Sequence, residues 1–487
     1  MSRSETATRG GVGLHLLVVL VVWAAIYLPG LGTLEIKGEE GRRILPAVTM
    51  LQTGNFIVPQ VGSDPYFNKP PLVNWLVAAS FRVFGERSEW AARFPSTLCV
   101  LAVALAFVAI ARRPLGAGGS LAGALVWLTN IGLIEKGRQI EIEALYVSIS
   151  GLAIICWLSW FQERRSPWRT WLVPWFFLGL GLLAKGPLHL VFFYAVVVAV
   201  LHCTGELRQL WRIPHLAGVL LMLALFAAWA IPCLRMMQPG DVAHTWSRQF
   251  TGRLSGEGFD FGGWLLNVPR GLGYFLPWTL LLPLLRGTDF GSDRRAQMAR
   301  GLQWAIGLSF LGVSLLPGSL ARYTMPLLVP VSWLIAMLLT TARAPALRWP
   351  RRVAPALRLP VLVSLIACAT IAIYAFAVMP HLQKRAKIKT IAAQINAALP
   401  PAEPLYAVDP DYQPFLFYVR DPIVYLSRVA EVPRVAGHLL VQPEREGEAL
   451  ASSQWLPRRA RPLLRLKDYR GKQVILLEIA ENSPGSG

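Results

Sequence analysis

Charge and cysteine are scarce in this 487-residue sequence, and each shortage excludes a class of protein. Charged residues make up 16% of the chain and hydrophobic residues 54%, whereas soluble domains carry roughly 25% charge. The five cysteines lie in or beside apolar runs, so neither a disulfide framework nor a C-x-x-C metal site is available: Cys99, Cys156, Cys203, Cys233 and Cys368. The composition therefore excludes a wholly soluble protein and a disulfide-rich secreted scaffold.

Acidic residues are also few, with 28 Asp and Glu against 48 Lys and Arg and a formal net charge of +20. An excess of this size is typical of nucleic-acid binders, but here the arginines gather in alternate loops between apolar runs. The loops hold Arg112 and Arg113; Arg164, Arg165 and Arg169; Arg208 and Arg212; Arg286, Arg294, Arg295 and Arg300; and Arg343, Arg348, Arg351, Arg352 and Arg358. This is the positive-inside pattern of a membrane protein, and it predicts no nucleic-acid partner.

Long apolar runs are what the sequence has in abundance. Runs of about 17 to 25 residues are long enough to cross a bilayer as helices. We predict about eleven spans: 11–31, 93–111, 118–134, 144–161, 170–184, 187–203, 213–234, 269–285, 302–317, 323–341 and 359–379. The first run is long and lacks an obvious cleavage site, so we expect it to be retained. The arginine pattern places the N-terminus of this multi-pass membrane protein in the cytoplasm.

The first outer loop, about residues 32–90, is too long for a simple connector. An acidic pair at Glu39 and Glu40 precedes a short mixed helix, which Gly54-Asn55 is expected to end. The segment 72–84 is apolar but too short to span easily, and we expect a helix lying in the membrane interface. The loop therefore has structure of its own on the outer face.

The same loop carries groups that suit chemistry on a lipid phosphate. Glu39 and Glu40 offer a proton acceptor and an orienting carboxylate, while Arg42 and Lys69 offer cations for a phosphate. The alternative is an ordinary solvated loop between two helices. We interpret it as the catalytic loop of a membrane-embedded enzyme.

Further charges stand at the mouths of later spans. Arg138 and Glu143 belong to a charged run before the span at 144–161, where ionisable groups are costly unless they face water or a cavity. Ordinary interfacial snorkelling is the alternative for this run. Lys185 and Arg322 lie in later outer turns and are candidate ligands of an anion. The Gly-rich stretch 236–268 is either a segment that covers a site or a floppy connector.

The composition changes after about residue 380, where charge rises and the apolar runs shorten. We predict a membrane domain over 1–380 and a small extracytoplasmic α/β domain over 381–487 with a disordered end. The expected elements are a helix at 388–399 and strands at 405–408, 415–418, 423–425, 438–441 and 474–477. The fold class is thus an all-α polytopic membrane domain with outer-face interfacial helices and an α/β tail.

A series of short motifs, in order over about residues 10–345, resembles a known family. The motifs are EEGR (39–42), GNFIVP (54–59), PYFNKPP (65–71), AARFPS (91–96), GR with EAL (137–138 and 143–145) and KGP (185–187). They resemble the bacterial integral-membrane glycosyltransferases of the C type, a family 39-like group typified by aminoarabinose lipid A transferase and the protein O-mannosyltransferases. That family usually has Asp where this chain has Glu39 and Glu143.

The resemblance implies a polyprenyl-phosphate-linked sugar donor, a lipid A-like, glycan or protein acceptor, surrounding membrane lipids and inversion at the anomeric carbon. It places Glu39 on the acceptor or reacting centre, with Glu40 beside it and Glu143 as the second acid. It places the cations on or near the donor phosphate: Arg42, Lys69, Lys185, Arg138 and Arg322. No cofactor is certain; outer carboxylates are able to hold a divalent cation, but no ligand spacing demands one, and we assign no metal ligand.

Two other classes of protein share parts of this pattern. A polytopic lipid or glycan transporter or flippase also has many spans and buried charge, although its ionisable groups are expected near mid-span. A structural or assembly protein needs no convergence of acids and cations. The discriminating observation is whether Glu39, Lys69, Glu143 and Lys185 surround one cavity.

Overall fold

The computed structural model describes residues 3–487 except 63, 67–68, 238–260, 342, 344–352, 386, 402, 421, 468–470 and 482–487, with side chains from residue 11 onward. The described chain divides into two compact units. Unit 1 comprises residues 1–31, 67–73 and 93–377, and unit 2 comprises 32–66, 74–92 and 378–487. Most of the first outer loop therefore groups with the tail. Much of the predicted Gly-rich loop lies outside the described residues.

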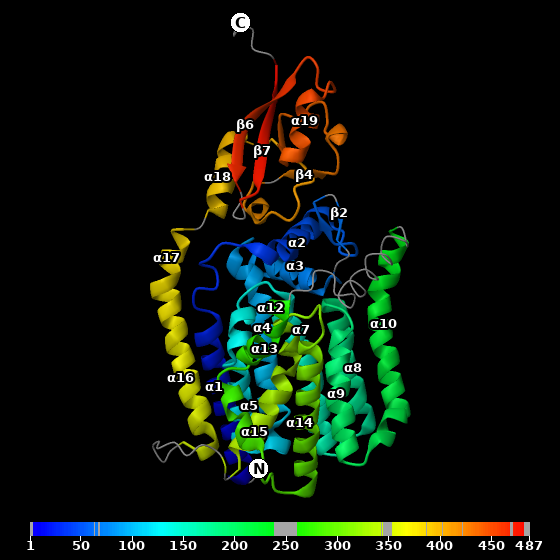
Figure 1. Ribbon diagram of the computed structural model, residues 1–487, viewed down its shortest axis with the longest axis vertical. Helices are drawn as coiled ribbons and strands as arrows, with labels where there is room; N and C mark the ends of the chain where they lie inside the picture. Colours follow the sequence, from blue (N-terminus) through cyan, green and yellow to red (C-terminus); the bar gives the residue numbers. More distant parts are fainter. Residues whose placement is uncertain are drawn as a thin grey trace. The chain divides into compact units, whose positions relative to one another are not determined.

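Unit 1 is a set of helices that run alongside one another (Figure 1). They are α1 (Arg3–Tyr27), α4 (Glu89–Ala109, within the unit from Arg93), α5 (Arg112–Leu128), α6 (Ile131–Gly137), α7 (Ile142–Gln162), α8 (Pro167–Ala184), α9 (Leu188–Cys203), η2 (Leu207–Trp211), α10 (Ile213–Arg235), α12 (Phe261–Leu265), α13 (Asn267–Tyr274), η3 (Trp278–Leu285), α14 (Asp293–Ser314), η4 (Ala321–Leu327), α15 (Leu328–Leu339), α16 (Pro355–Ile373) and the π-turn η5 (Tyr374–Val378).

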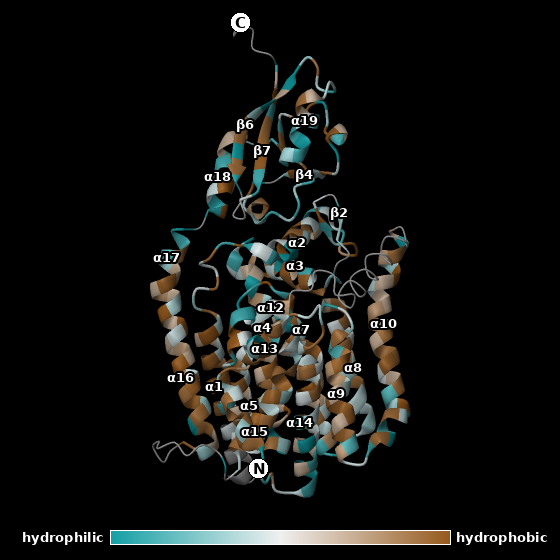
Figure 2. Cartoon of the chain, viewed as in Figure 1, coloured by the Kyte–Doolittle hydropathy of each residue, from teal (hydrophilic) through white to brown (hydrophobic). Residues whose placement is uncertain are grey.

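Several of these helices are long and apolar enough to cross a membrane, and hydrophobic residues predominate along them (Figure 2). Within the described residues, five meet the length and composition of a span, and the bent pair α5 and α6 makes a sixth. The multi-pass character predicted from the sequence is confirmed. The predicted run at 269–285 is divided between α13 and the 3-10 helix η3, which shows why apolar length alone does not fix the number of spans.

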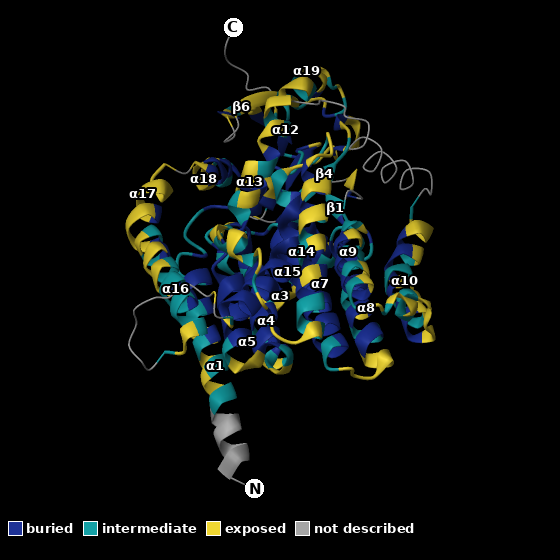
Figure 3. Cartoon of the chain, turned by 60° about the horizontal axis from the view of Figure 1, so that its bottom comes forward, coloured by how far each residue is buried: buried dark blue, intermediate teal, exposed yellow. Residues whose placement is uncertain are grey.

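Helices α7 and α15 form the centre of unit 1, whereas α10 and α16 lie at its margin (Figure 3). In the most apolar 18-residue stretch of α7, 94% of the residues are buried, whereas in that of α10 only 28% are buried. A helix that is apolar on all sides and buried on all sides belongs to the interior of a bundle. The apolar outer faces of α10 and α16 have the character of surfaces that face lipid. Glu143, in the first turn of α7, is therefore a charged residue in the interior of the bundle.

Unit 2 contains the outer loop and the tail. Its elements are η1 (Gly38–Glu40), α2 (Gly41–Thr53), β1 (Gln60–Val61), β2 (Asp64–Pro65), α3 (Leu72–Phe84, within the unit from Asn74), α17 (Met379–Gln383), α18 (Ile388–Ala398), β3 (Leu405–Val408), η6 (Pro414–Phe417), β4 (Ile423–Leu426), η7 (Val429–Glu431), β5 (His438–Val441), α19 (Pro443–Ala451), β6 (Arg459–Lys467) and β7 (Gln473–Ala480). The predicted mostly helical chain with a small C-terminal sheet is confirmed.

The tail is built on a five-stranded mixed sheet in the order β4-β3-β5-β7-β6. Strand β3 pairs in parallel with β4 and β5, and β7 pairs antiparallel with β5 and β6. Its core packs side chains of the sheet against α19 and the loops around η7: Tyr406, Val408, Val429, Val432, Ala436, Leu439, Val441, Ala449, Trp455, Ile475, Leu477 and Ile479. Burial of this set drives the tail to fold.

Within the tail, one predicted strand is wrong and one strand was missed. Residues 415–418 lie mainly in the 3-10 helix η6, where Pro414 occupies the first turn and the apolar side chains that follow are buried. A short apolar run is compatible with either structure, so its periodicity could not decide. Strand β6 escaped prediction because it is an exposed edge strand rich in arginine, and Pro462 and Leu463 interrupt its alternation of polar and apolar residues.

The outer loop follows its sequence signals closely. Helix α2 ends at Gly54, whose φ of +72° is the left-handed conformation that glycine adopts at little cost. After a short hairpin of β1 and β2, Pro70 and Pro71 interrupt the chain and α3 begins at Leu72. The predicted helix at 72–84 is confirmed as a helix. Its interfacial placement stays a prediction.

Candidate functional site

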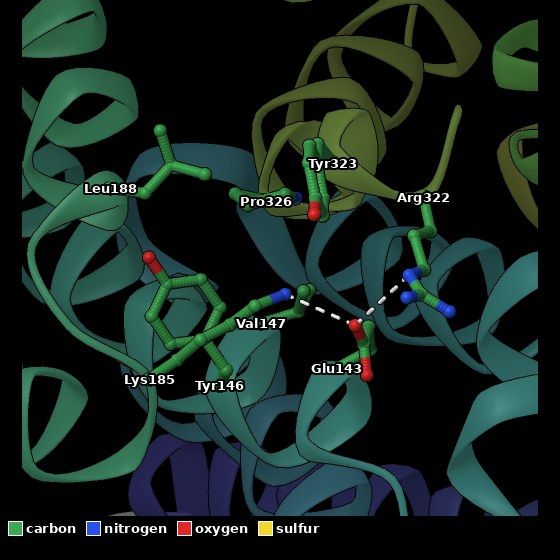
Figure 4. A pocket seen from close by; sticks show the side chains of 8 residues that line it. All are labelled: Glu143, Tyr146, Val147, Lys185, Leu188, Arg322, Tyr323 and Pro326. Atoms are coloured by element: carbon green, nitrogen blue, oxygen red, sulfur yellow. Dashed lines mark hydrogen bonds and ion pairs between the residues drawn. The ribbon is translucent and has the colours of Figure 1, made fainter. Parts of the chain in front are cut away.

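A pocket in unit 1 lies where the start of α7, the turn between α8 and α9, and η4 meet (Figure 4). The space between its side chains measures about 200 Å³, a volume that includes its opening to solvent. Its lining is made by Glu143, Tyr146, Val147, Lys185, Leu188, Arg322, Tyr323 and Pro326. Three charged side chains thus share one small, otherwise aromatic and aliphatic cavity. These three residues were candidates from the sequence.

Glu143 joins the two cations of the pocket (Figure 4). Its Oε1 atom lies 3.1 Å from Lys185 Nζ and 3.3 Å from Arg322 Nε. The side chains of Glu143 and Lys185 are only 11% and 10% exposed, so solvent screens their attraction weakly. Within this trio two positive charges face one negative charge. The surplus positive charge favours binding of an anion.

Lys185 is also held by aromatic rings on two sides. Its Nζ lies 5.3 Å from the ring centre of Tyr146 and 5.2 Å from that of Tyr323. Each is a cation–π contact, and together they restrain the ammonium at the wall of the pocket. Neither tyrosine could be recognised in advance as a partner of Lys185, because a tyrosine within or beside an apolar run usually serves as a core residue.

The side chain of His189 stabilises the turn that contains Lys185. Lys185 follows the last residue of α8, and Gly186 has a φ of +110°, which a side chain would make strained. The buried ring of His189 lies with Nδ1 2.9 Å from the Gly186 carbonyl oxygen and Nε2 2.8 Å from that of Leu178. The ring therefore ties the turn to α8 and fixes the direction in which Lys185 leaves the backbone.

A second ion cluster precedes α7. Lys136 Nζ lies 2.8 Å from Glu135 Oε1 and 3.3 Å from Glu141 Oε1. Burial raises the pKa of the Glu141 carboxyl, and the charge of Lys136 opposes that rise. The charged run thus contains internal ion pairs, while Glu143 turns toward the pocket.

Arg138 is buried, and its side chain caps the C-terminal end of α1. Its guanidinium donates hydrogen bonds to the carbonyl oxygens of Ile26 and Pro29, at and just past the last turn of α1. A cation at a helix C-terminus satisfies carbonyls that have no partner within the helix. These contacts give Arg138 a structural task. Its assignment to the donor phosphate stays a prediction.

The other candidates from the first outer loop lie in unit 2, at η1 and the start of α2. Arg42 Nη1 lies 3.2 Å from Glu39 Oε2, and this pair is partly exposed. The guanidinium carbon of Arg42 also lies 3.8 Å from the ring centre of Tyr412. Glu40 is buried, and its Oε2 accepts a hydrogen bond of 3.3 Å from the backbone N–H of Lys37. Glu40 therefore braces the turn, whereas Glu39 reaches solvent.

Lys69 is half-buried and belongs to unit 1, in the segment before α3. Convergence of Glu39 and Lys69 with Glu143 and Lys185 on one cavity stays a prediction. Among the residues that the structure describes, no cluster of three or more His, Cys, Asp or Glu side chains is arranged to hold a metal ion.

Comparison with known proteins adds to this geometry. Residues 68–231 match the family described as dolichyl-phosphate-mannose-protein mannosyltransferase. The chain is 27% identical over 302 residues to the undecaprenyl phosphate-alpha-4-amino-4-deoxy-L-arabinose arabinosyl transferase of Pseudomonas savastanoi pv. phaseolicola, covering 61% of this chain and 56% of that protein. It is 26% identical over 329 residues to transferase 1 of that description from Pseudomonas fluorescens, covering 65% and 58%. The chain thus spans somewhat more than half the length of these relatives.

The fold has a counterpart among solved structures. The crystal structure of ArnT from Cupriavidus metallidurans bound to undecaprenyl phosphate aligns with a TM-score of 0.67 and 20% identity, covering 98% of this chain and 99% of that one. The fold class is therefore that of a polytopic ArnT-like membrane protein. The resemblance predicted from the sequence is confirmed: the chain is similar to C-type glycosyltransferases, and among them to aminoarabinose transferases.

Proposed function

We propose that this chain is a membrane glycosyltransferase that moves a sugar from a polyprenyl-phosphate donor to a lipid, glycan or protein acceptor. The observation that carries the proposal is the pocket in which Glu143 gathers Lys185 and Arg322 with a surplus of positive charge. Such a pocket suits a phosphate that must be held and then released. The named relatives are arabinosyl transferases, which favours a transferase over the transporter alternative.

In the proposed reaction the acceptor oxygen attacks the anomeric carbon while the bond from that carbon to the phosphate oxygen breaks. The configuration at the anomeric carbon inverts, and the phosphate leaves with the bonding electrons. Glu39 accepts the proton of the acceptor hydroxyl, or orients that hydroxyl, because its carboxylate is accessible. Arg42, Lys69 and Lys185 neutralise the charge on the departing phosphate.

Glu143 has a different task in this proposal. Its carboxylate pairs with Lys185 and Arg322, and it keeps both cations directed at the pocket when no donor is bound. Two uncompensated cations in a largely buried site are costly, so a permanent counter-ion stabilises the empty pocket. An orienting role of this kind predicts a partial loss of transfer in Glu143→Gln, smaller than the loss expected for a general base.

The proposed orientation follows the arginine loops. The membrane domain over 1–380 crosses the cell inner membrane about eleven times, with the N-terminus in the cytoplasm. An odd number of spans then places the first loop and the domain at 381–487 outside the cytoplasm. An alkaline phosphatase fused after residue 385 is therefore expected to be active, and the same fusion after Arg295 inactive. Phosphatase activity in whole cells, normalised to fusion abundance, is the measurement. The reverse pattern contradicts the orientation and the proposed site together.

The function itself is tested by profiling lipid-linked sugars. A deletion strain is expected to accumulate one polyprenyl-phosphate sugar that the wild type consumes, which names the donor. Complementation with the intact chain should remove the excess, while complementation with Glu39→Gln should leave it. A deletion strain with an unchanged profile of lipid-linked sugars contradicts the proposal.

The cations of the first loop give a further prediction. Arg42→Ala and Lys69→Ala should each weaken binding of undecaprenyl phosphate about tenfold or more, since a charge-assisted contact to a phosphate contributes roughly 1.5–3 kcal/mol. Titration of the purified, detergent-solubilised protein measures the affinity. Arg461→Ala on β6 is a matched control, because Arg461 is an exposed arginine paired with Glu478 in the same unit as Arg42. Wild-type affinity in both loop variants contradicts the phosphate role.

A further inference from the structure

The glycine of the Glu39–Arg42 motif is approached closely by the tail. Gly41 has φ −54° and ψ −43°, ordinary helical values that any residue adopts, so its own backbone does not require glycine. A Cβ at this position lies only 2.6 Å from the backbone carbonyl oxygen of Tyr412 and 3.4 Å from Pro414. Backbone atoms cannot move aside as a flexible side chain does. Gly41 is therefore required by the approach of the loop that contains Tyr412.

Tyr412 contacts the motif with its ring as well. The Arg42 guanidinium carbon is 3.8 Å from the centre of that ring, within the range of a cation–π contact. A guanidinium stacked by its face keeps its edge N–H groups free, and here one of them meets Glu39 Oε2 at 3.2 Å. Arg42 is thus held between Tyr412 and Glu39, although its side chain is long and one-third exposed.

The residues just before the motif are tied to the tail by hydrogen bonds. The carboxylate of Glu35 accepts from the backbone N–H groups of Ile388 at 2.9 Å and Lys389 at 3.0 Å, the first two residues of α18. A carboxylate at a helix N-terminus satisfies free donors and complements the helix dipole. Glu35 therefore fixes the start of the loop on α18.

A second tie comes from Tyr418. Its hydroxyl accepts from the backbone N–H of Ile36 at 2.7 Å and donates to Glu89 Oε1 at 3.0 Å. Glu89 also pairs with Lys389 at 2.6 Å. Residues 35 and 36, four and three positions before Glu39, are thus each anchored to the tail. The contact of Tyr412 with Arg42 is thus part of a defined interface within unit 2.

We propose that Tyr412 is a positioning residue for the transfer reaction: its ring sets the direction of the Arg42 guanidinium and, through Arg42, the placement of the Glu39 carboxylate. This inference rests on the proposed function of Glu39 and Arg42 and extends it to the tail. Tyr412 touches neither donor nor acceptor in this account. The tail contributes by restraining a charged pair that is partly exposed to solvent.

The test uses the full-length protein in detergent with undecaprenyl phosphate as the probe. Tyr412→Leu is expected to weaken its binding roughly threefold to 20-fold, the range that a cation–π contact supports. Tyr412→Phe keeps the ring and is expected to restore affinity to within about twofold. Tyr425→Leu is the matched control, since Tyr425 is another half-buried tyrosine of the tail, on β4.

A double-mutant cycle distinguishes positioning from general damage to the fold. In an Arg42→Ala background, Tyr412→Leu is expected to cause no further loss of affinity, because its effect passes through Arg42. An equal loss in both backgrounds overturns the inference. Gly41→Ala is a second variant, which keeps every other side chain yet displaces the Tyr412 loop, and it should also weaken binding. Unchanged affinity in Tyr412→Leu overturns the inference, whatever the result for Gly41→Ala.

The same measurements separate the two proposals. If Arg42→Ala weakens binding while Tyr412→Leu does not, only the positioning role is overturned. If Arg42→Ala itself binds undecaprenyl phosphate as the wild type does, the phosphate role of Arg42 and the positioning role are overturned together. The thermal unfolding midpoint of each variant, measured without lipid, reports whether the fold is intact.

Discussion

Replacing Glu39 with glutamine should lower sugar transfer by two or more orders of magnitude while leaving affinity for undecaprenyl phosphate close to that of the wild type. Glutamine keeps the size of the side chain and much of its hydrogen bonding but removes the charge and the basicity. A loss of about 10² or more is the usual consequence of removing a general base. Turnover and binding must be measured separately, in the same preparation, with the donor that accumulates in the deletion strain.

Glu86→Gln provides the control for this variant. Glu86 is an exposed carboxylate of the same compact unit, hydrogen-bonded only locally to Ser88 in the described contacts, and we expect its replacement to leave turnover unchanged. Transfer at a near wild-type rate by Glu39→Gln, with normal donor binding in Lys69→Ala, means that the first outer loop is an ordinary solvated loop.

Lys185→Met should have the second large effect, a loss of roughly tenfold to 150-fold in affinity for undecaprenyl phosphate. Methionine keeps an unbranched, flexible chain but has no ammonium, so the variant removes one charge-assisted contact of about 1.5–3 kcal/mol. It also leaves Arg322 as the only cation paired with Glu143 in this pocket among the described contacts. Titration with undecaprenyl phosphate measures the loss, and Lys384→Met, an exposed lysine, is the control.

A double variant separates lost binding from lost stability. Lys185→Met leaves a buried carboxylate with one partner fewer, which itself destabilises the protein. Lys185→Met with Glu143→Gln removes both charges and should recover the unfolding midpoint without recovering affinity. If the double variant binds undecaprenyl phosphate as well as the wild type, the ammonium is not a phosphate ligand.

The sequence was most informative where a local rule applies. Apolar length identified the membrane helices, and Gly54 and Pro71 marked the end of α2 and the approach to α3, because left-handed glycine and proline act on the backbone next to them. The edge strand β6 has no such signal, since its arginines face solvent and only its pairing with β7 makes it a strand. Residues 459–467 form a strand because of their pairing with β7 and not because of their intrinsic strand propensity.

Residue type predicted which groups are candidates for chemistry, but not what else they contact. The sequence named Glu143, Lys185 and Arg322 without distances, and only the packing of α7 against η4 places them within one pocket. The partners of Lys185 and Arg42 are tyrosines far away in the chain, and an isolated tyrosine carries no sign that a cation will lie on its ring. Such contacts depend on the fold and have no local cause.

The loop that contains the Glu39–Arg42 pair is held in place by residues that are synthesised much later than the loop itself. Glu35 and the N–H of Ile388 are separated by 353 positions, and Ile36 and the hydroxyl of Tyr418 by 382. A chain emerges N-terminus first, so the loop is made long before these partners exist. A chain that stops before residue 388 has membrane helices but lacks the contacts that fix the loop. If the chain has the proposed function, sugar transfer should therefore begin only once the tail has been synthesised.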